Sequence, residues 1–313
     1  MPRYIAARLL ATIPVMGIVA VVVFSLLRIT PGDPAAIIAG DSATSEQLEQ
    51  IRQSLGLDQP LYIQFPVWLG QVLSGDLGTS LISGVSVSSM ISTRFGPTLA
   101  LSTSIILFSI VVAIPLGVIA AWKQGTLLDR SVSAFSVLGF SMPVFVTAYI
   151  LVLIFSIMLG WLPVQGYRAP ADGLWAFLSR LILPTLALST AYIALIARIT
   201  RTSVLEVMGE DYIRTARAKG LRERAVLTRH GLRNAAVPII TVIGLGITNL
   251  ISGVVVTESV FNLPGLGRLV VEAVLARDYP VIQGLILLFS FIYILINLVV
   301  DVLYTLFDPR IRY

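Results

Sequence analysis

Neutral polar side chains are sparse in the apolar stretches of this chain, and four of them could contact a solute. Thr248, Asn249 and Ser252 share one stretch, and Asn297 lies in another, four residues before Asp301. Residues four apart lie on one face of a helix. Two interpretations stay open: these residues line a translocation path, or their amide and hydroxyl groups hydrogen-bond one helix to its neighbour.

Residues typical of enzyme active sites are almost missing. His230 is the only histidine and there is no cysteine, which excludes a His-paired or thiolate zinc site and most His-dependent catalysis. The chain has no Gly-x-x-x-x-Gly-Lys-Ser/Thr run to cradle a phosphate. The sequence therefore predicts no catalytic residue, no metal ligand and no cofactor bound by this chain.

Positive charge is concentrated between residues 198 and 236, which hold nine of the 22 Lys and Arg residues. Within this segment, residues 210–220 form a predicted short helix that Gly220 ends, because glycine tolerates the left-handed conformation found there. A projecting helix of this kind can dock on a soluble partner. A basic loop can equally lie against anionic lipid headgroups, and charge alone does not separate the two interpretations.

The elements that carry these residues are predicted to be membrane helices. The chain is 56% hydrophobic and 12% charged, with a mean hydropathy of +0.90, whereas soluble domains are about 25% charged. A helix needs about 20 apolar residues to cross the hydrocarbon core. We predict an all-α polytopic membrane protein with six transmembrane helices, on the uncharged stretches 9–27, 98–122, 131–167, 181–197, 235–257 and 279–300. The third stretch is too long for one upright span and contains Gly139, Pro143 and Gly160, so we expect it to tilt, to kink or to run along the membrane surface.

Basic residues set the predicted orientation, because positively charged loops stay on the cytoplasmic side of a membrane. With the N-terminus inside, fifteen Lys and Arg residues are cytoplasmic and seven are outside. Six crossings then return the C-terminus to the cytoplasm. The first apolar stretch is longer than a signal-peptide core and lacks a convincing cleavage site, so we expect a retained helix. The same charge bias explains the basic pI without a nucleic-acid partner.

Several longer motifs follow one another along the chain. They are Pro31-Gly32-Asp33-Pro34, Leu55-Gly56-Leu57-Asp58-Gln59-Pro60-Leu61, Gly75-Asp76-Leu77-Gly78, Asp211-Tyr212-Ile213-Arg214-Thr215-Ala216-Arg217-Ala218-Lys219-Gly220-Leu221, Pro264-Gly265-Leu266-Gly267-Arg268, Arg277-Asp278-Tyr279-Pro280 and Asp308-Pro309-Arg310. With these motifs the chain resembles the permease subunits of ATP-binding cassette importers, in the dipeptide and oligopeptide permease family and of the B-subunit type. The resemblance covers essentially the whole chain.

The resemblance implies the type I importer permease fold in a bacterial inner membrane, with both termini cytoplasmic. It divides the chain into an N-terminal transmembrane helix (1–30), an extracytoplasmic segment (31–96) and a core of five transmembrane helices (97–313) with a cytoplasmic coupling loop (198–236). The implied partners are membrane lipid, a homologous permease in a heterodimer, two cytoplasmic ATPases that bind ATP and Mg, and an extracytoplasmic solute-binding protein.

The resemblance also makes the short basic helix a coupling helix that fits a groove on the ATPase. The general importer signature, Glu-Ala-Ala followed by three residues and Gly, falls on Arg214-Thr215-Ala216 and Gly220, so its first two positions are replaced. These departures resemble the B-type peptide permeases. The expected coupling residues are Glu210, Asp211, Tyr212, Arg214, Thr215, Ala216, Ala218, Lys219, Gly220 and Leu221.

The implied function is ATP-driven import of dipeptides or oligopeptides by alternating access, with ATP hydrolysed by the partner subunits. Relatives that carry nickel chelates, glutathione, opines or oligosaccharides share the motifs and remain an alternative. A standalone secondary carrier is an alternative of a different class, and a membrane scaffold that transports nothing is a third. The central parts of all six stretches lack ionisable residues, which disfavours proton-coupled transport.

Overall fold

A computed structural model describes residues 2–29, 44–46, 49, 52 and 58–307 of the chain. The elements of this described part are helices, with one isolated bridge between Thr79 and Ser86. Three motif segments, at residues 31–34, 55–57 and 308–310, lie outside the described residues. The prediction of an all-α membrane protein is confirmed.

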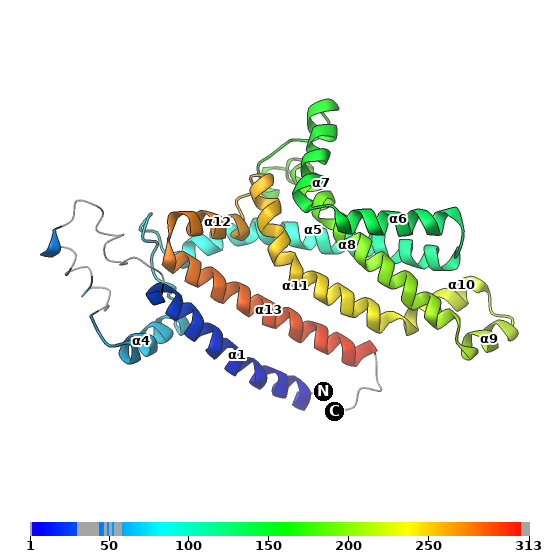
Figure 1. Cartoon of the computed structure of the whole chain (residues 1–313), viewed down its shortest axis with the longest axis horizontal. Coiled ribbons are helices and arrows are strands. Elements are labelled where there is room, and N and C mark those ends of the chain that lie inside the picture. Colours follow the sequence, from blue (N-terminus) through cyan, green and yellow to red (C-terminus); the bar gives the residue numbers. More distant parts are fainter. Residues whose placement is uncertain (1, 30–43, 47–48, 50–51, 53–57, 308–313) are drawn as a thin grey trace. The chain divides into compact units, whose positions relative to one another are not determined.

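Four described helices are long and apolar enough to cross a bilayer (Figure 1). They are α5 (Val87–Trp122), α8 (Leu174–Met208), α11 (Ala236–Val260) and α13 (Tyr279–Phe307). A bent pair that starts with α6 (Leu127–Ser141) makes a fifth candidate span, and α1 (Pro2–Ile29) contains a shorter apolar run, Leu10–Ser25. Each predicted apolar stretch thus contributes to a helix, but length and composition alone identify four spans, or five with the bent pair.

Of the three outcomes expected for the third stretch, the structure shows a kink, and it lies at Pro143. Helix α6 ends at Ser141, and α7 (Val144–Leu151) starts after the proline and continues as a π-helix, Val152–Met158. Proline disfavours a helical conformation in the residue before it, and Met142 is extended. The chain bends by 107° between the two halves. Figure 1 shows α7 pointing away from the line of α6.

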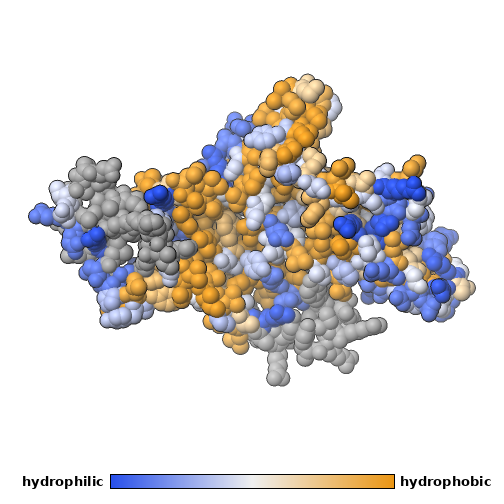
Figure 2. Space-filling view, in the orientation of Figure 1, coloured by the Kyte–Doolittle hydropathy of each residue, from blue (hydrophilic) through white to orange (hydrophobic). Residues whose placement is uncertain are grey.

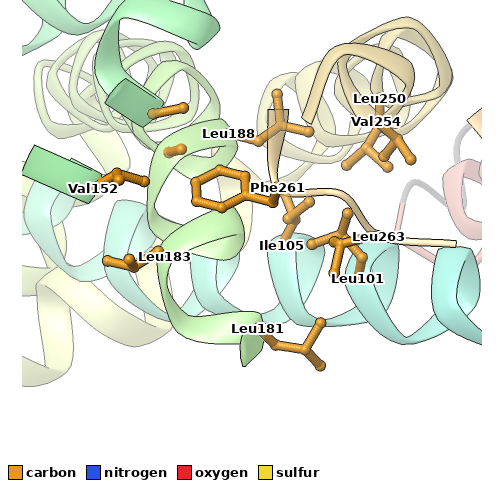
Figure 3. Close-up of a cluster of buried hydrophobic side chains, with 12 residues drawn as sticks. Leu101, Ile105, Val152, Leu181, Leu183, Leu188, Leu250, Val254, Phe261 and Leu263 are labelled. Atoms are coloured by element: carbon orange, nitrogen blue, oxygen red, sulfur yellow. The ribbon is translucent and has the colours of Figure 1, made fainter. Parts of the chain in front are cut away.

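The larger of two compact groups comprises the described parts of Pro97–Gly267 and Ile296–Tyr313. Its central helix is α8, which packs against α6, α7 and α11. Figure 3 shows the apolar core, which collects side chains from α5, the π-helix, α8, α11 and the turn after α11: Leu101, Ile105, Val152, Leu181, Leu183, Leu188, Leu250, Val254, Phe261 and Leu263. This core fixes these helices against one another.

Glycine allows α5 and α8 to approach closely in this group. A Cβ atom on Gly117 would lie 2.6 Å from the Ala197 carbonyl oxygen and 2.6 Å from Thr200 Cβ. Contacts this short do not occur, so only glycine fits between the two helices. Helix α8 continues from there to Met208, well past the uncharged stretch 181–197, so Arg198 and Arg201 are helical residues.

The second group comprises the described parts of Met1–Gly96 and Arg268–Leu295. In it, α4 (Leu61–Leu73) packs on α1 through aromatic side chains, with the Phe24 ring centroid 5.2 Å from that of Phe65 and 5.5 Å from that of Trp68. The Gln283 amide of α13 donates a hydrogen bond to the Val23 carbonyl of α1 at 2.9 Å. Helix α12 (Leu266–Ala276) leads into α13.

Candidate functional site

The best-defined candidate site is a short helix, α9 (Asp211–Ala218), that follows the basic end of α8. Glu210 precedes it in an extended conformation, and Gly220 ends it with a φ of +78°, the left-handed region that favours glycine. The helix that the sequence predicted, and its glycine stop, are therefore confirmed.

One narrow face of α9 attaches it to the rest of the larger group. Ile213 and Ala216, three residues apart, are 0% and 5% exposed and pack with buried Val226. Val207 and Met208, at the end of α8, pack against the same cluster. Val226 begins a π-helix, Val226–Leu232, which follows the short α10 (Glu223–Ala225). Because only this face is buried, the opposite face of α9 is presented to solvent.

Most of the expected coupling residues lie on the presented surface. Nine of them are exposed: Glu210, Asp211, Tyr212, Arg214, Thr215, Ala218, Lys219, Gly220 and Leu221. Ala216 is the exception, because it is buried against the anchoring cluster. Its place in the structure is that of a support for the helix.

Two ion pairs lie on the surface of this segment. Arg214 contacts Asp211 at 3.2 Å, and Arg217 contacts Glu223 at 2.7 Å across the Gly220 turn. Exposed pairs of this kind contribute about 0–1 kcal/mol. Neighbouring atoms shield part of the Tyr212 phenol from water and raise its pKa, and the Glu210 carboxylate adds to this effect. Figure 2 shows hydrophilic surface gathered over the α9 and α10 end, as a docking surface for a water-soluble protein would require.

The residues expected to line a path differ in how far the structure exposes their side chains. Asn249 and Ser252 are both exposed on α11, and Ser259 lies seven residues further along the same stripe. Thr248 is only partly buried and lies beside that stripe. The sequence interpretation did not include Ser259, although its spacing from Ser252 was a usable signal. Asn297 is exposed on α13.

A buried carboxylate organises the turn after α11. Glu258 is 0% exposed, and the Thr98 hydroxyl donates a hydrogen bond to its Oε1 at 2.6 Å. The Leu266 amide donates in turn to Thr98 Oγ1 at 2.7 Å, and the Leu263 amide donates to the Glu258 carbonyl at 2.9 Å. These contacts join α5, α11 and the turn that leads to α12.

A second buried charge lies near the basic ends of α6 and α8. Asp129 accepts two hydrogen bonds from the Arg201 guanidinium, at Nε and at Nη2, the latter at 2.8 Å. The Gly125 amide donates a third at 3.0 Å. Among the residues that the structure describes, no group of three or more His, Asp and Glu side chains could hold a metal ion.

Comparison with known protein families settles the class of this chain. Residues 113–313 match the family described as the binding-protein-dependent transport system inner membrane component, and residues 1–102 match the N-terminal region of such membrane components. The chain belongs to this family of importer permeases. The predicted resemblance to ATP-binding cassette importer permeases is thereby confirmed.

Curated relatives match the permease over its whole length. It is 52% identical over 310 residues, 99% of both chains, to the probable peptide ABC transporter permease protein y4tP of Sinorhizobium fredii (strain NBRC 101917 / NGR234). It is 47% identical over 313 residues, 100% of both chains, to the glutathione transport system permease protein GsiC of Escherichia coli (strain K12).

A solved structure supports the fold of the permease. A chain of the MetNI methionine ABC transporter, in an inward-facing conformation, aligns with a TM-score of 0.58 at 18% identity, covering 70% of this chain and 96% of that one. At this identity the likeness concerns the fold alone. It confirms the type I importer permease architecture.

Proposed function

We propose that this permease imports dipeptides and short oligopeptides by alternating access, as the non-catalytic membrane subunit of the importer. The observation that supports a peptide cargo is the 52% identity, over 99% of both chains, to a protein named as a probable peptide permease. The rest of the importer would be a homologous permease in a heterodimer, two ATPases that bind ATP and Mg, and an extracytoplasmic solute-binding protein.

The exposed face of α9 is the proposed contact with an ATPase. Its anchoring face fixes it to the end of α8 and to the π-helix that leads towards α11. A displacement of α9 would therefore move α8 directly, and α11 through the π-helix. The ATPase would contact Glu210, Asp211, Tyr212, Arg214, Thr215, Ala218, Lys219, Gly220 and Leu221, with Ala216 supporting them from behind.

The solute path is proposed to run along the exposed stripe of α11. Asn249 and Ser252 supply neutral hydrogen-bonding groups on that stripe, which suit a peptide backbone without binding it tightly. Thr248 and Asn297 are proposed to flank the same path. The second permease subunit would close it.

The proposed location is a bacterial inner membrane, with both termini and α9 on the cytoplasmic side. The excess of Lys and Arg around α9 supports this orientation, because positively charged segments stay in the cytoplasm. The solute-binding protein would then deliver its cargo to the opposite side.

Reconstituted transport tests the cargo. The full complex is placed in proteoliposomes with ATP available to the ATPases, and the solute-binding protein and a labelled dipeptide are supplied on the outer side. Saturable, ATP-dependent accumulation of the dipeptide is the expected result. Stimulated ATP hydrolysis without dipeptide accumulation would be consistent with the importer architecture and would refute the dipeptide as its cargo.

Glutathione is the second candidate cargo, because relatives 47% identical over their full length are named glutathione permeases. The same vesicles, given labelled glutathione in place of the dipeptide, separate the two proposals. Uptake of glutathione without uptake of the dipeptide would favour this second candidate.

The coupling assignment has its own test, Gly220→Arg. The glycine has a φ of +78°, so a side chain strains the end of α9 and adds bulk beside the proposed ATPase contact. We expect uptake to be lost while the chain still inserts. The matched control is Gly84→Arg, which imposes a similar strain at a φ of +67° outside α9. Normal uptake by the Gly220 variant would refute the assignment.

A further inference from the structure

A cavity of about 320 Å³ lies between α6 and α8, near the Asp129–Arg201 ion pair. Helices α6 and α8 pack on each other within the larger group. The polar groups that line the cavity come from both helices. They are Ser133 and Ser136 on α6, and Arg198, Arg201 and Thr202 on α8.

Several of the hydrogen-bond donors that line the cavity have no described partner. Within the described part of the chain, no ion pair or hydrogen bond involves the side chains of Arg198 or Ser133. Arg201 binds Asp129 through Nε and Nη2, which leaves its Nη1 without a described partner. The Ser136 and Thr202 hydroxyls donate to carbonyls of their own helices and keep free lone pairs. A ligand here must therefore supply mainly acceptor oxygens.

The cavity carries net positive charge. Arg198 and Arg201 contribute two positive charges, the buried Asp129 carboxylate cancels one of them, and Arg130 lies close enough to act on Asp129 as well. A phosphodiester carries a negative charge that such a site neutralises, and guanidinium groups are well shaped to bind phosphate oxygens. Aliphatic Val137 forms part of the wall, which suits the glycerol and upper acyl portion of a lipid.

The cavity lies at the ends of the uncharged stretches of both helices, which is the level at which lipid headgroups lie in a membrane. The uncharged run 181–197 of α8 ends at Arg198, and the uncharged stretch of α6 starts immediately after Arg130. Both helices therefore leave the hydrocarbon core beside this cavity. Exposed apolar side chains continue along α6 from the cavity, with Leu138 63% exposed and Phe140 67% exposed, so acyl chains have an apolar surface to follow.

We propose that this cavity binds the phosphodiester headgroup of an anionic phospholipid of the cytoplasmic leaflet. Arg198 and the free Nη1 of Arg201 would bind the phosphate oxygens, Ser133 would donate a further hydrogen bond, and Asp129 would hold Arg201 in place. Basic pockets between transmembrane helices on the cytoplasmic side are suited to such headgroups. The inference rests on the cytoplasmic placement of α9 in the proposed function, but not on the identity of the cargo.

Direct lipid binding to the purified full complex tests the proposal, with no cargo or ATP present. A phosphatidylglycerol with a fluorescent tail is titrated into the detergent-solubilised complex. We expect saturable binding that Arg198→Gln weakens about fivefold, the effect of one basic residue near an anionic headgroup. Arg198→Lys should recover most of the affinity. The matched control is Arg229→Gln, another exposed arginine without a described partner, which should bind like the unmodified chain.

A second pair of variants tests the cavity without changing its charge. Val137→Trp fills the cavity and should weaken binding, whereas Leu127→Trp changes an 80% exposed residue at the start of α6, outside the lining, and should not. This pair keeps the test decisive if the Arg198 variant does not fold.

Competition experiments distinguish a lipid phosphate from free inorganic phosphate as the ligand of the cavity. Inorganic phosphate at millimolar concentration should not displace the lipid, because it lacks the acyl chains. Displacement by inorganic phosphate would assign the site to a free anion, and displacement by the labelled dipeptide would assign it to the solute path. Either result, or equal binding by the Arg198→Gln and Arg229→Gln variants, would overturn the lipid proposal. Failed dipeptide uptake with intact lipid binding would refute only the cargo.

Discussion

The carboxylate of Glu258 occupies the space that a side chain on Gly265 would need. A Cβ atom built on Gly265 would lie 2.0 Å from Glu258 Oε1 and 2.2 Å from its Cδ. Gly267 is similarly enclosed, since its Cβ would lie 2.7 Å from the Val255 Cα. The two glycines of the Pro264–Arg268 motif thus let the turn fold back over a buried acid at the end of α11.

Gly265→Ala should destabilise the permease, because the Glu258 carboxylate that it meets is itself held by Thr98. Overpacking of this kind costs about 1–3 kcal/mol or more, so the thermal unfolding temperature of the purified chain should fall. Gly96→Ala is the control: it lies in α5 with nothing within 4 Å of its Cβ, and alanine favours a helix. Equal unfolding temperatures for the two variants would contradict the assigned role of Gly265.

Thr98→Val should remove a hydroxyl that donates to Glu258 and accepts from the Leu266 amide. Valine keeps the shape but leaves buried polar groups without this partner, at a cost of about 1–3 kcal/mol. Thr98→Ser should restore most of the stability, which thermal unfolding of the three proteins measures. If serine were as damaging as valine, the lost methyl group rather than the hydroxyl would explain the effect.

The Asp129–Arg201 pair should be strongly coupled. Removing one partner of a buried pair costs about 3–5 kcal/mol, and we expect the lower end because the Arg201 side chain is 26% exposed. Asp129→Asn and Arg201→Gln together should cost less than the sum of the two single changes. Chemical unfolding of all four proteins measures this coupling. Asp211→Asn, in a pair with 93% and 76% exposed side chains, should change stability by less than about 1 kcal/mol.

Thiol labelling should map the proposed path along α11. The chain has no cysteine, so single substitutions report cleanly. Asn249→Cys and Ser252→Cys should react with a small, charged, membrane-impermeant thiol reagent at rates that change when the ATPases bind ATP. Leu250→Cys, at a position that is 4% exposed, should stay unreactive in both conditions. Rates for the first two variants that are insensitive to ATP would place their side chains outside the path.

The sequence by itself determined the membrane class, the approximate helix positions and the short basic helix. Uncharged stretches of membrane length require helices, since every backbone polar group must be satisfied inside the bilayer. Gly220 and the polarity of residues 210–219 likewise predicted α9 from local preferences alone. For the third stretch the sequence left a tilt, a kink or a surface segment open, and the structure shows the kink, at Pro143.

Only the tertiary structure decided which side of each helix is used. Ala216 was expected at the coupling surface, but its packing with Ile213 and Val226 makes it an anchor. The contacts of Glu258 with Thr98 and of Asp129 with Arg201 join residues 160 and 72 positions apart, and local spacing carries no information about such pairs. Burial and pairing depend on which helices meet, and that is set by packing over the whole chain.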